Sequence, residues 1–415
     1  MERTETYHHL QLDCGVELAA IEIAGRKTTT LEIRVFGGLA AEPPDRLGLA
    51  GIVEETIGKG TAEKNAQELM DAFDMIGAQV SSAVGRESMV FRFSCLPEYV
   101  EQALALQAEM LRTPSFPEDF CGVALELAQQ ELTALDDDPG ELARRLIAPR
   151  AYGPLLGRHE LGTRESLRRI TREDIISYWR RHFSAKRMTV SAAGAVDWNR
   201  LRIATERLFA GFGEDQGGDR GPIPIDFSPG HEHHPKNIEQ EHILFCWPGL
   251  SVADDDYPVE RLILAALGEG MSSRLFTTVR EQQGLAYWVS AWDEHPRNGG
   301  MIFVGAATRP EHVDQTYQAI LREVERLEAD WTEEELDRAK TGLMAKTCTH
   351  GELTRARAAE LSGDLFYYGR PLPTDEKIDL LARVTLDDIR RYLSAHPRDR
   401  RCLLTLGPVP MKATG

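Results

Sequence analysis

Short apolar segments with the pattern of β-strands alternate along this chain with longer segments whose apolar residues repeat at helical spacing. Residues 16–25 and 28–39 predict two strands joined by a polar turn. Helical spacing predicts an amphipathic helix at residues 47–57, and a longer helix is expected to begin near Pro117. Short strands mixed with longer helices are typical of α+β lobes.

Residues 268–288, GEGMSSRLFTTVREQQGLAYW, predict a helix followed by a strand. The apolar residues have helical spacing after a glycine-rich start, and Gly284 is expected to end the helix. Arg280 is then at a helix end and Tyr287 at the head of a strand, where both side chains can reach one peptide carbonyl. The alternative is that Arg280 pairs with a surface carboxylate and Tyr287 anchors the strand.

The order of predicted elements returns about 210 residues later in the chain. The matching pairs of segments are residues 36–60 with 247–270, and residues 167–196 with 380–409. Within them, Thr171 and Asp174 open a helix as a capping box, with Asp in place of the usual Glu. Matching features in the same order predict two structurally related halves.

A segment rich in Gly, Pro and charged residues separates the two halves and predicts an exposed linker. The expected division is an N-terminal lobe at residues 1–215, a linker at 216–240 and a C-terminal lobe at 241–415. The linker contains the polar run HEHH at residues 231–234. Because a flexible linker holds ligands poorly, we expect this run to be exposed to solvent, with adventitious metal binding as the alternative.

Composition narrows the class of protein. A chain of 415 residues that is 42% hydrophobic and 27% charged predicts a globular protein of more than one lobe. The net charge of −18 argues against a nucleic-acid partner, and no stretch approaches the roughly 18 apolar residues of a membrane span. The six cysteines are far apart and are expected to be buried free thiols. The N-terminal segment lacks the apolar run of a signal peptide, so we expect a cytoplasmic protein, or a periplasmic one if a leader was removed.

The motifs together resemble the M16 metallopeptidases, the relatives of mitochondrial processing peptidase and insulinase. Residues 48–61, GLAGIVEETIGKGT, look like the family's GLAHFLEHMLFKGT. Residues 268–288 resemble its second-half signature, in which an Arg and a Tyr at this spacing grip the substrate. The resemblance extends from Leu10 to Pro410. It implies an α+β fold of two related α/β lobes in a clamshell, the LuxS/MPP-like metallohydrolase fold.

The resemblance also implies where a zinc site would lie, because the family carries HxxEH on a helix and a further Glu on a later helix. The two histidine positions are occupied here by Gly51 and Glu55. Glu54 stands at the position of the general base, and Glu131, or Glu126 on the same helix, at that of the distal ligand. Glycine has no ligating atom and the carboxylates offer only hard oxygen donors. We therefore expect no metal and no cofactor in this chain.

A chain without zinc ligands but with the Arg280 and Tyr287 pair resembles the non-catalytic subunit of two-chain M16 peptidases. The resemblance implies a heterodimer in which an HxxEH-bearing partner holds zinc. Arg280 and Tyr287 are then expected to contact the peptide substrate, with Tyr287 helping to stabilise the oxyanion. Gly268 and Gly270 are expected to begin the helix through a tight turn, and a role in handling substrate is the alternative.

Three other functions remain compatible with the sequence. One is a structural assembly protein, like the M16-like core proteins of respiratory complexes. Another is a peptide-binding homodimer without a catalytic partner. The third is a hydrolase that binds Mg²⁺ or Ca²⁺ through Glu54, Glu55 and Glu131. An HxxEH-bearing relative encoded beside this chain favours the heterodimeric peptidase.

Overall fold

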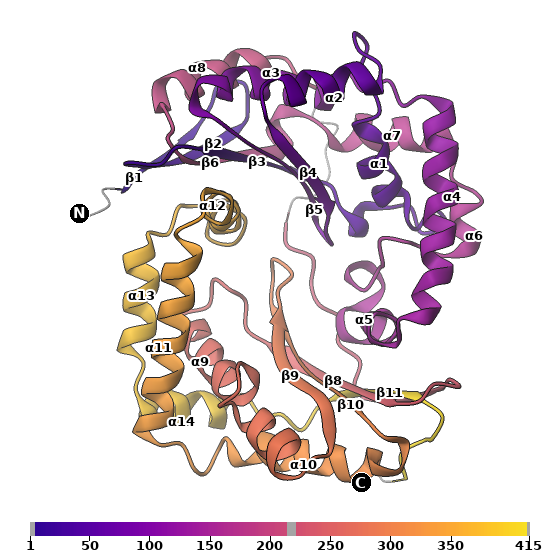
Figure 1. Ribbon diagram of the computed structural model, residues 1–415, viewed down its shortest axis with the longest axis vertical. Coiled ribbons are helices and arrows are strands. Elements are labelled where there is room, and N and C mark those ends of the chain that lie inside the picture. Colours follow the sequence, from indigo (N-terminus) through magenta and orange to yellow (C-terminus); the bar gives the residue numbers. More distant parts are fainter. Residues whose placement is uncertain (1–4, 214–220, 413–415) are drawn as a thin grey trace. The chain divides into compact units, whose positions relative to one another are not determined.

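The computed structural model describes residues 5–213 and 221–412, which form two compact units (Figure 1). The first unit consists of residues 1–134, 158–221 and 349–373, and the second of residues 135–157, 222–348 and 374–415. Neither unit is a continuous piece of the chain, unlike the lobes expected at residues 1–215 and 241–415. Each unit includes one segment from the other half of the sequence.

The first unit contains a six-stranded sheet in the order β1-β2-β6-β3-β5-β4. Its strands are β1 (Glu5–Gln11), β2 (Glu17–Ile23), β3 (Thr29–Phe36), β4 (Gln79–Val84), β5 (Ser88–Cys95) and β6 (Met188–Gly194). β2 and β6 are parallel, and every other pair is antiparallel. All residues of β6 are buried, because helices cover both faces of the sheet at this point.

The helices of the first unit are α1 (Leu49–Ile57), α2 (Ala66–Met75), α3 (Val100–Arg112), α4 (Glu118–Ala134), α6 (Arg164–Leu167), α7 (Arg172–His182), α8 (Trp198–Phe209) and α12 (Thr354–Tyr368). α3 and α8 lie on one face of the sheet and α12 on the other (Figure 1). The predicted helices near residue 47 and Pro117 correspond to α1 and α4.

The second unit contains a five-stranded sheet in the order β7-β11-β8-β10-β9. Its strands are β7 (Gly230–Pro235), β8 (Glu241–Gly249), β9 (Ala286–Glu294), β10 (Gly300–Thr308) and β11 (Cys402–Gly407). Its helices are α5 (Pro139–Leu156), α9 (Tyr257–Gly268), α10 (Val313–Arg326), α11 (Glu333–His350, apart from its last two residues), α13 (Thr374–Arg383) and α14 (Leu386–Ala395). α5 packs on β8 and β11, and α10 lies on the opposite face of the sheet (Figure 1).

The two sheets repeat one topology. The order β2-β6-β3-β5-β4 in the first unit matches β7-β11-β8-β10-β9 in the second, and the first pair is parallel in each. The capping box of Thr171 and Asp174 at the start of α7 recurs at α14 with Thr385 and Asp388. The predicted relationship between the two halves is therefore confirmed.

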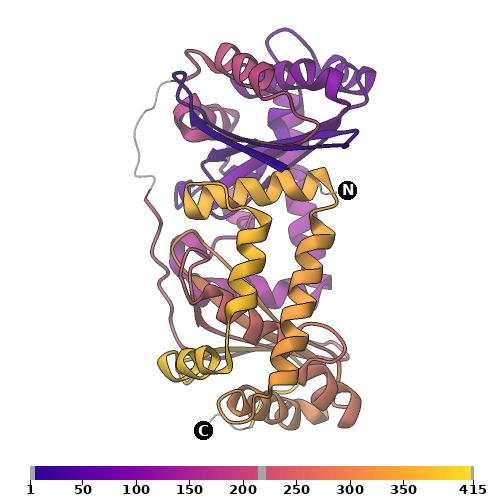
Figure 2. The same ribbon diagram turned by 90° about the vertical axis from the view of Figure 1, so that its left-hand side faces the viewer.

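The two halves of the sequence exchange one helix. α5 follows α4 and α12 follows α11, so the two helices occupy matching places in the repeat. α12 nevertheless packs on the first sheet, where Leu361 and Leu365 share a buried cluster with Ile21 and Ala193. Figure 2 shows α12, in light orange, running along this sheet. Each half of the sequence thus supplies one helix to the unit built mainly by the other half.

The expected linker at residues 216–240 is partly a strand. Its first residues lie among positions 214–220, outside the described part of the chain, whereas Gly230–Pro235 form β7 and pair in parallel with β11. His233 Nδ1 lies 2.9 Å from Thr405 Oγ1, and Glu232 pairs with Arg150 at 2.5 Å. The interpretation of the HEHH run as exposed, flexible chain was wrong, because backbone pairing with β11 holds it at the edge of a sheet.

The six cysteines are unpaired, as expected, although only Cys95, Cys121, Cys246 and Cys402 are buried. No helix in residues 5–213 or 221–412 is both long and apolar enough to cross a membrane.

Candidate functional site

Arg280 and Tyr287 lie next to each other in the second unit. Arg280 belongs to the π-helical segment Phe276–Gln282, and Tyr287 is the second residue of β9. The guanidinium carbon of Arg280 lies 5.7 Å from the centroid of the Tyr287 ring and 4.7 Å from that of Phe276, which is cation–π distance. The Arg280 side chain is 40% exposed and Tyr287 is 78% exposed. Both polar groups are therefore accessible to a ligand.

A β-bulge determines the direction of the Tyr287 side chain. Along β10, each residue from Met301 to Ala307 pairs with the next residue of β9, counting back from Glu294 to Trp288. The following pair joins Thr308 to Ala286 and skips Tyr287. Tyr287 is the extra residue between these pairs. A bulge breaks the alternation of faces along a strand, and bulges are frequent beside active sites. As a result, the neighbouring side chains of Tyr287 and Trp288 are both exposed.

The segment that carries Arg280 is short and firmly anchored. Its neighbour Val279 is fully buried, and Gly284, with φ at +61°, ends the segment before β9. π-helical turns are rare and are often found at functional sites. The expected helix end for Arg280 is thus confirmed, although the segment is π-helical rather than α-helical.

The glycines before this segment do not begin its helix, contrary to expectation. Gly268 is the last residue of α9, and a Cβ atom there would lie 2.2 Å from the backbone nitrogen of Ala291. Gly270 has a φ of +80°, which favours glycine. Met271, expected on the apolar face of the helix, is 81% exposed. Close packing of α9 against β9 and a left-handed turn explain both glycines.

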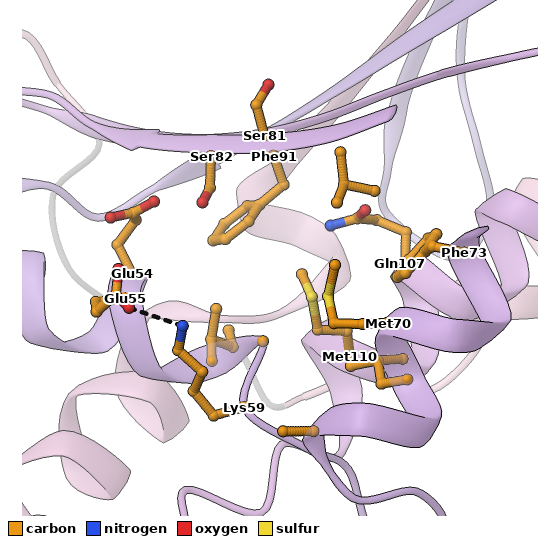
Figure 3. A pocket seen from close by; sticks show the side chains of 15 residues that line it. Glu54, Glu55, Lys59, Met70, Phe73, Ser81, Ser82, Phe91, Gln107 and Met110 are labelled. Carbon is orange, nitrogen blue, oxygen red and sulfur yellow. Dashed lines mark ion pairs between the residues drawn. The ribbon is translucent and has the colours of Figure 1, made fainter. Parts of the chain in front are cut away.

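Glu54 and Glu55, where the sequence resemblance implies a zinc position, lie on α1 in the first unit and point toward different neighbours (Figure 3). The Glu55 carboxylate pairs with Lys59 one helical turn away, at 2.7 Å. Burial raises the pKa of Glu54, and a hydrogen bond from Ser82 opposes this shift. One carboxylate is therefore paired with a cation, and the other is partly desolvated.

The structure does not bring together a set of metal ligands at this position. A Cβ atom on Gly51 would lie 3.0 Å from the carbonyl oxygen of Glu160, so a larger side chain there would make a tight contact with this backbone. Glu131 is exposed on α4. Across the described residues, no three His, Cys, Asp or Glu side chains are grouped closely enough to hold a metal ion. Zinc therefore does not fit here, and the hypothesis of a carboxylate-bound Mg²⁺ or Ca²⁺ finds no support.

An apolar pocket of about 220 Å³ adjoins Glu54. Figure 3 shows Met70, Phe73, Phe91 and Met110 around it, with the carboxylates toward one side. Its lining comes from α1, α2, α3, β4 and β5, segments whose meeting no local pattern in the sequence reveals.

A larger cavity, of about 370 Å³, lies on the sheet of the second unit and is lined in part by Tyr287, Trp288 and Trp292. From the sequence, residues 286–292, AYWVSAW, were interpreted only as a strand, and this cavity was missed. The sequence did contain a signal for it: Trp288 and Trp292 are four residues apart, which places both side chains on one face of a strand.

Comparison with protein families gives two matches. The family described as "Peptidase M16 inactive domain" matches residues 169–343, and "Insulinase (Peptidase family M16)" matches residues 18–164. An uncharacterized zinc protease of Rickettsia felis is 26% identical over 387 residues, which cover 93% of each chain. A probable β subunit of mitochondrial-processing peptidase from Arabidopsis thaliana is 23% identical and covers 95% of this chain and 77% of that protein.

Two solved structures have the same fold. The peptidase M16 inactive domain from Pseudomonas fluorescens superposes with a TM-score of 0.90 at 20% identity, over 99% of this chain and 100% of that one. A protease from Helicobacter pylori gives a TM-score of 0.86 at 16% identity, over 97% and 100% of the two chains. The two-lobe architecture therefore recurs over their whole length.

Proposed function

Because the chain belongs to the M16 family of peptidases, we propose that it is the non-catalytic, substrate-binding subunit of a heteromeric zinc-dependent M16 peptidase. A second M16 chain that carries HxxEH would hold the zinc. This chain contributes Arg280 and Tyr287 to the peptide bound there, and it is inactive without its partner.

The contrast between two sets of residues carries this proposal. Gly51 has no side chain to bind a metal and leaves little room for one, while Glu55 is paired with Lys59. Arg280, half-buried with Glu281 at 4.0 Å, and the exposed Tyr287 lie at cation–π distance on a π-helical turn and a bulge. A scaffold protein has no need of such a pair, whereas a substrate-binding subunit does.

The chemistry of the pair suits a peptide undergoing hydrolysis. Metal-assisted attack of water on a peptide carbonyl places negative charge on its oxygen. The Tyr287 hydroxyl can donate a hydrogen bond to that oxygen, and the Arg280 guanidinium can donate to a neighbouring backbone carbonyl. Stacking of Arg280 on the Tyr287 ring holds both donors in one orientation before substrate arrives, which reduces the entropic cost of binding.

The test is cleavage of a fluorogenic peptide by this chain alone, by an HxxEH-bearing M16 chain from the same organism, and by the two mixed. Zinc is quantified in each sample. We expect activity in the mixture only, with zinc in the partner. Activity and stoichiometric zinc in this chain alone would overturn the proposal. A mixture no more active than the partner alone would favour a peptide-binding or structural homodimer.

A further inference from the structure

The cavity beside Tyr287 is built by one unit and has the size of a ligand site. Its floor is formed by residues 305–307 of β10, its walls by β8 and β9, and one end by the start of α5. Its volume of about 370 Å³ falls within the range of roughly 300–1,000 Å³ that is typical of ligand pockets. α5 packs on β8 and β11 and leaves this part of β9 and β10 open.

Two indole rings and a glycine shape the cavity. The ring centroids of Trp288 and Trp292 are 6.1 Å apart, with an angle of 45° between the ring planes. A Cβ atom on Gly305 would lie 2.7 Å from Cη2 of Trp288 and 3.1 Å from Cη2 of Trp292. Glycine within a strand weakens it and often marks close approach of another group. The missing side chain at Gly305 lets both indoles lie against β10, and Trp288 keeps 38% of its surface exposed.

The polar side chains around the cavity have partners of their own within the second unit. Glu141 pairs with Arg144 at 2.9 Å, and the Arg144 guanidinium carbon lies 5.0 Å from the ring centroid of Trp292. The Asp138 carboxylate accepts hydrogen bonds from two backbone N–H groups at the start of α5, each 3.1 Å long. Burial lowers the pKa of His242, so its imidazole is neutral at pH 7. Glu141 and Arg144 therefore balance each other's charge, and the Asp138 carboxylate is held by the start of α5.

Cationic groups already cover two of the aromatic faces, since Arg144 lies over Trp292 and Arg280 over Tyr287. A second cation would be repelled from them. A neutral ring, in contrast, finds stacking and edge-on partners at the distances of about 4.5–7 Å that aromatic pairs prefer. The chemistry thus favours an uncharged aromatic group over a basic one.

We propose that this cavity binds an aromatic side chain of a peptide, close to the residue whose backbone contacts Arg280 and Tyr287. The inference rests on the proposed function, and it adds a preference for peptides that carry Phe, Tyr or Trp at one position. Trp288 is the main specificity-determining residue, and Gly305 positions its indole.

The test uses the blocked pentapeptide acetyl-Ala-Ala-Phe-Ala-Ala-amide, with analogues that carry Ala or Arg at the central position. Each is titrated into ¹⁵N-labelled, deuterated full-length chain while the indole N–H signals of the six tryptophans are recorded. Trp288→Phe and Trp292→Phe assign the two relevant signals. We expect the Phe peptide to shift both signals and to bind about tenfold or more tightly than the Ala peptide. Equal shifts with the Arg peptide, shifts at other tryptophans only, or no shifts would overturn the inference.

Two variants and one control locate the binding. Trp288→Ala removes a wall, and Gly305→Ala keeps both indoles but displaces them, so each should weaken binding of the Phe peptide about tenfold. Trp198→Ala is the matched control, because Trp198 stacks on His8 in the first unit at 4.7 Å. Unchanged binding in Gly305→Ala, with a native circular-dichroism spectrum, would contradict the assignment even if Trp288→Ala failed to fold.

The binding test is independent of catalysis. If the indole N–H signals of Trp288 and Trp292 shift but the chain does not activate a zinc-bearing partner, the aromatic site is supported and the proposed function is overturned. Cleavage that depends on Tyr287, with no indole shifts, would support the proposed function and overturn the aromatic site.

Discussion

The guanidinium carbon of Arg280 lies 5.7 Å from the ring centroid of Tyr287, although one residue belongs to a π-helical turn and the other to a bulged strand. Two rare backbone features meet at this one contact. Each orients a hydrogen-bond donor, and the stacking couples the two donors. The residues should therefore act as a unit when they are changed.

Tyr287→Phe should lower turnover in the mixture with a zinc-bearing partner by roughly 10²- to 10³-fold, because it removes one donor to the developing oxyanion. Arg280→Ala should also slow cleavage, and the double variant should lose less than the product of the two single effects. Steady-state kinetics of the four forms measure this coupling. Tyr99→Phe is the control, and a full-rate Tyr287→Phe would exclude the oxyanion role.

Restoring the family motif through Gly51→His and Glu55→His should not restore a stable zinc site. The side chain at position 51 would make a tight contact with the carbonyl oxygen of Glu160, and overpacking of this kind costs about 1–3 kcal/mol. The measurements are zinc content and urea denaturation, with Glu55→His alone as the control on the exposed side of α1. Stoichiometric zinc in a double variant of unchanged stability would show that a histidine side chain fits at position 51.

Arg357 on α12 should be essential for the exchanged helix. It is 1% exposed and contacts Glu5 at 2.7 Å, the hydroxyl of Tyr7 at 2.6 Å and Glu360 at 2.5 Å. Arg357→Ala removes a buried side chain and the cation that joins Glu5 to Glu360, and it should destabilise the protein by about 2 kcal/mol or more.

Urea denaturation measures the effect of Arg357→Ala against Arg355→Ala on the exposed side of α12. A loss no larger than that of Arg355→Ala would mean that this network does not hold α12 on the first sheet.

Glu42 should make stability fall as the pH rises. Burial raises its pKa from 4.5 to about 7, against hydrogen bonds from the backbone N–H groups of Gly48 and Ala50. Between pH 4.5 and 7 the unfolded chain loses this proton while the folded chain keeps it, so Glu42 lowers the free energy of unfolding progressively across this window. The loss is fully present above pH 7 and amounts to roughly 3 kcal/mol.

Glu42→Gln should remove this slope, so its stability relative to the unmodified chain should rise from pH 5 to pH 7. Denaturation at several pH values measures the difference, with the exposed Glu173→Gln as the control. Parallel pH profiles for Glu42→Gln and the unmodified chain would contradict the raised pKa.

Local features of this protein could be predicted from the sequence alone. The strands after Val16 and Thr28, the helix before Ile57 and the capping box at Thr171 depend on residues only a few positions apart. Hydrophobic periodicity and capping act within such windows, and the repeat follows from comparing them. The resemblance of residues 48–61 to the M16 motif, with Gly51 and Glu55 at its two histidine positions, is likewise visible in the letters themselves.

Contacts between distant segments were decided only by the tertiary structure. The exchange of α5 and α12 depends on which sheet each apolar face covers, and nothing within either helix specifies this. The bulge at Tyr287 depends on the register of β9 against β10. The tight space at position 51 depends on the carbonyl of Glu160, and the aromatic cavity depends on Gly305, which lies beneath two indoles. Each needs surfaces far apart in the chain to meet, so only the folded molecule shows how little room surrounds Gly51 and how Arg280 and Tyr287 come to lie together.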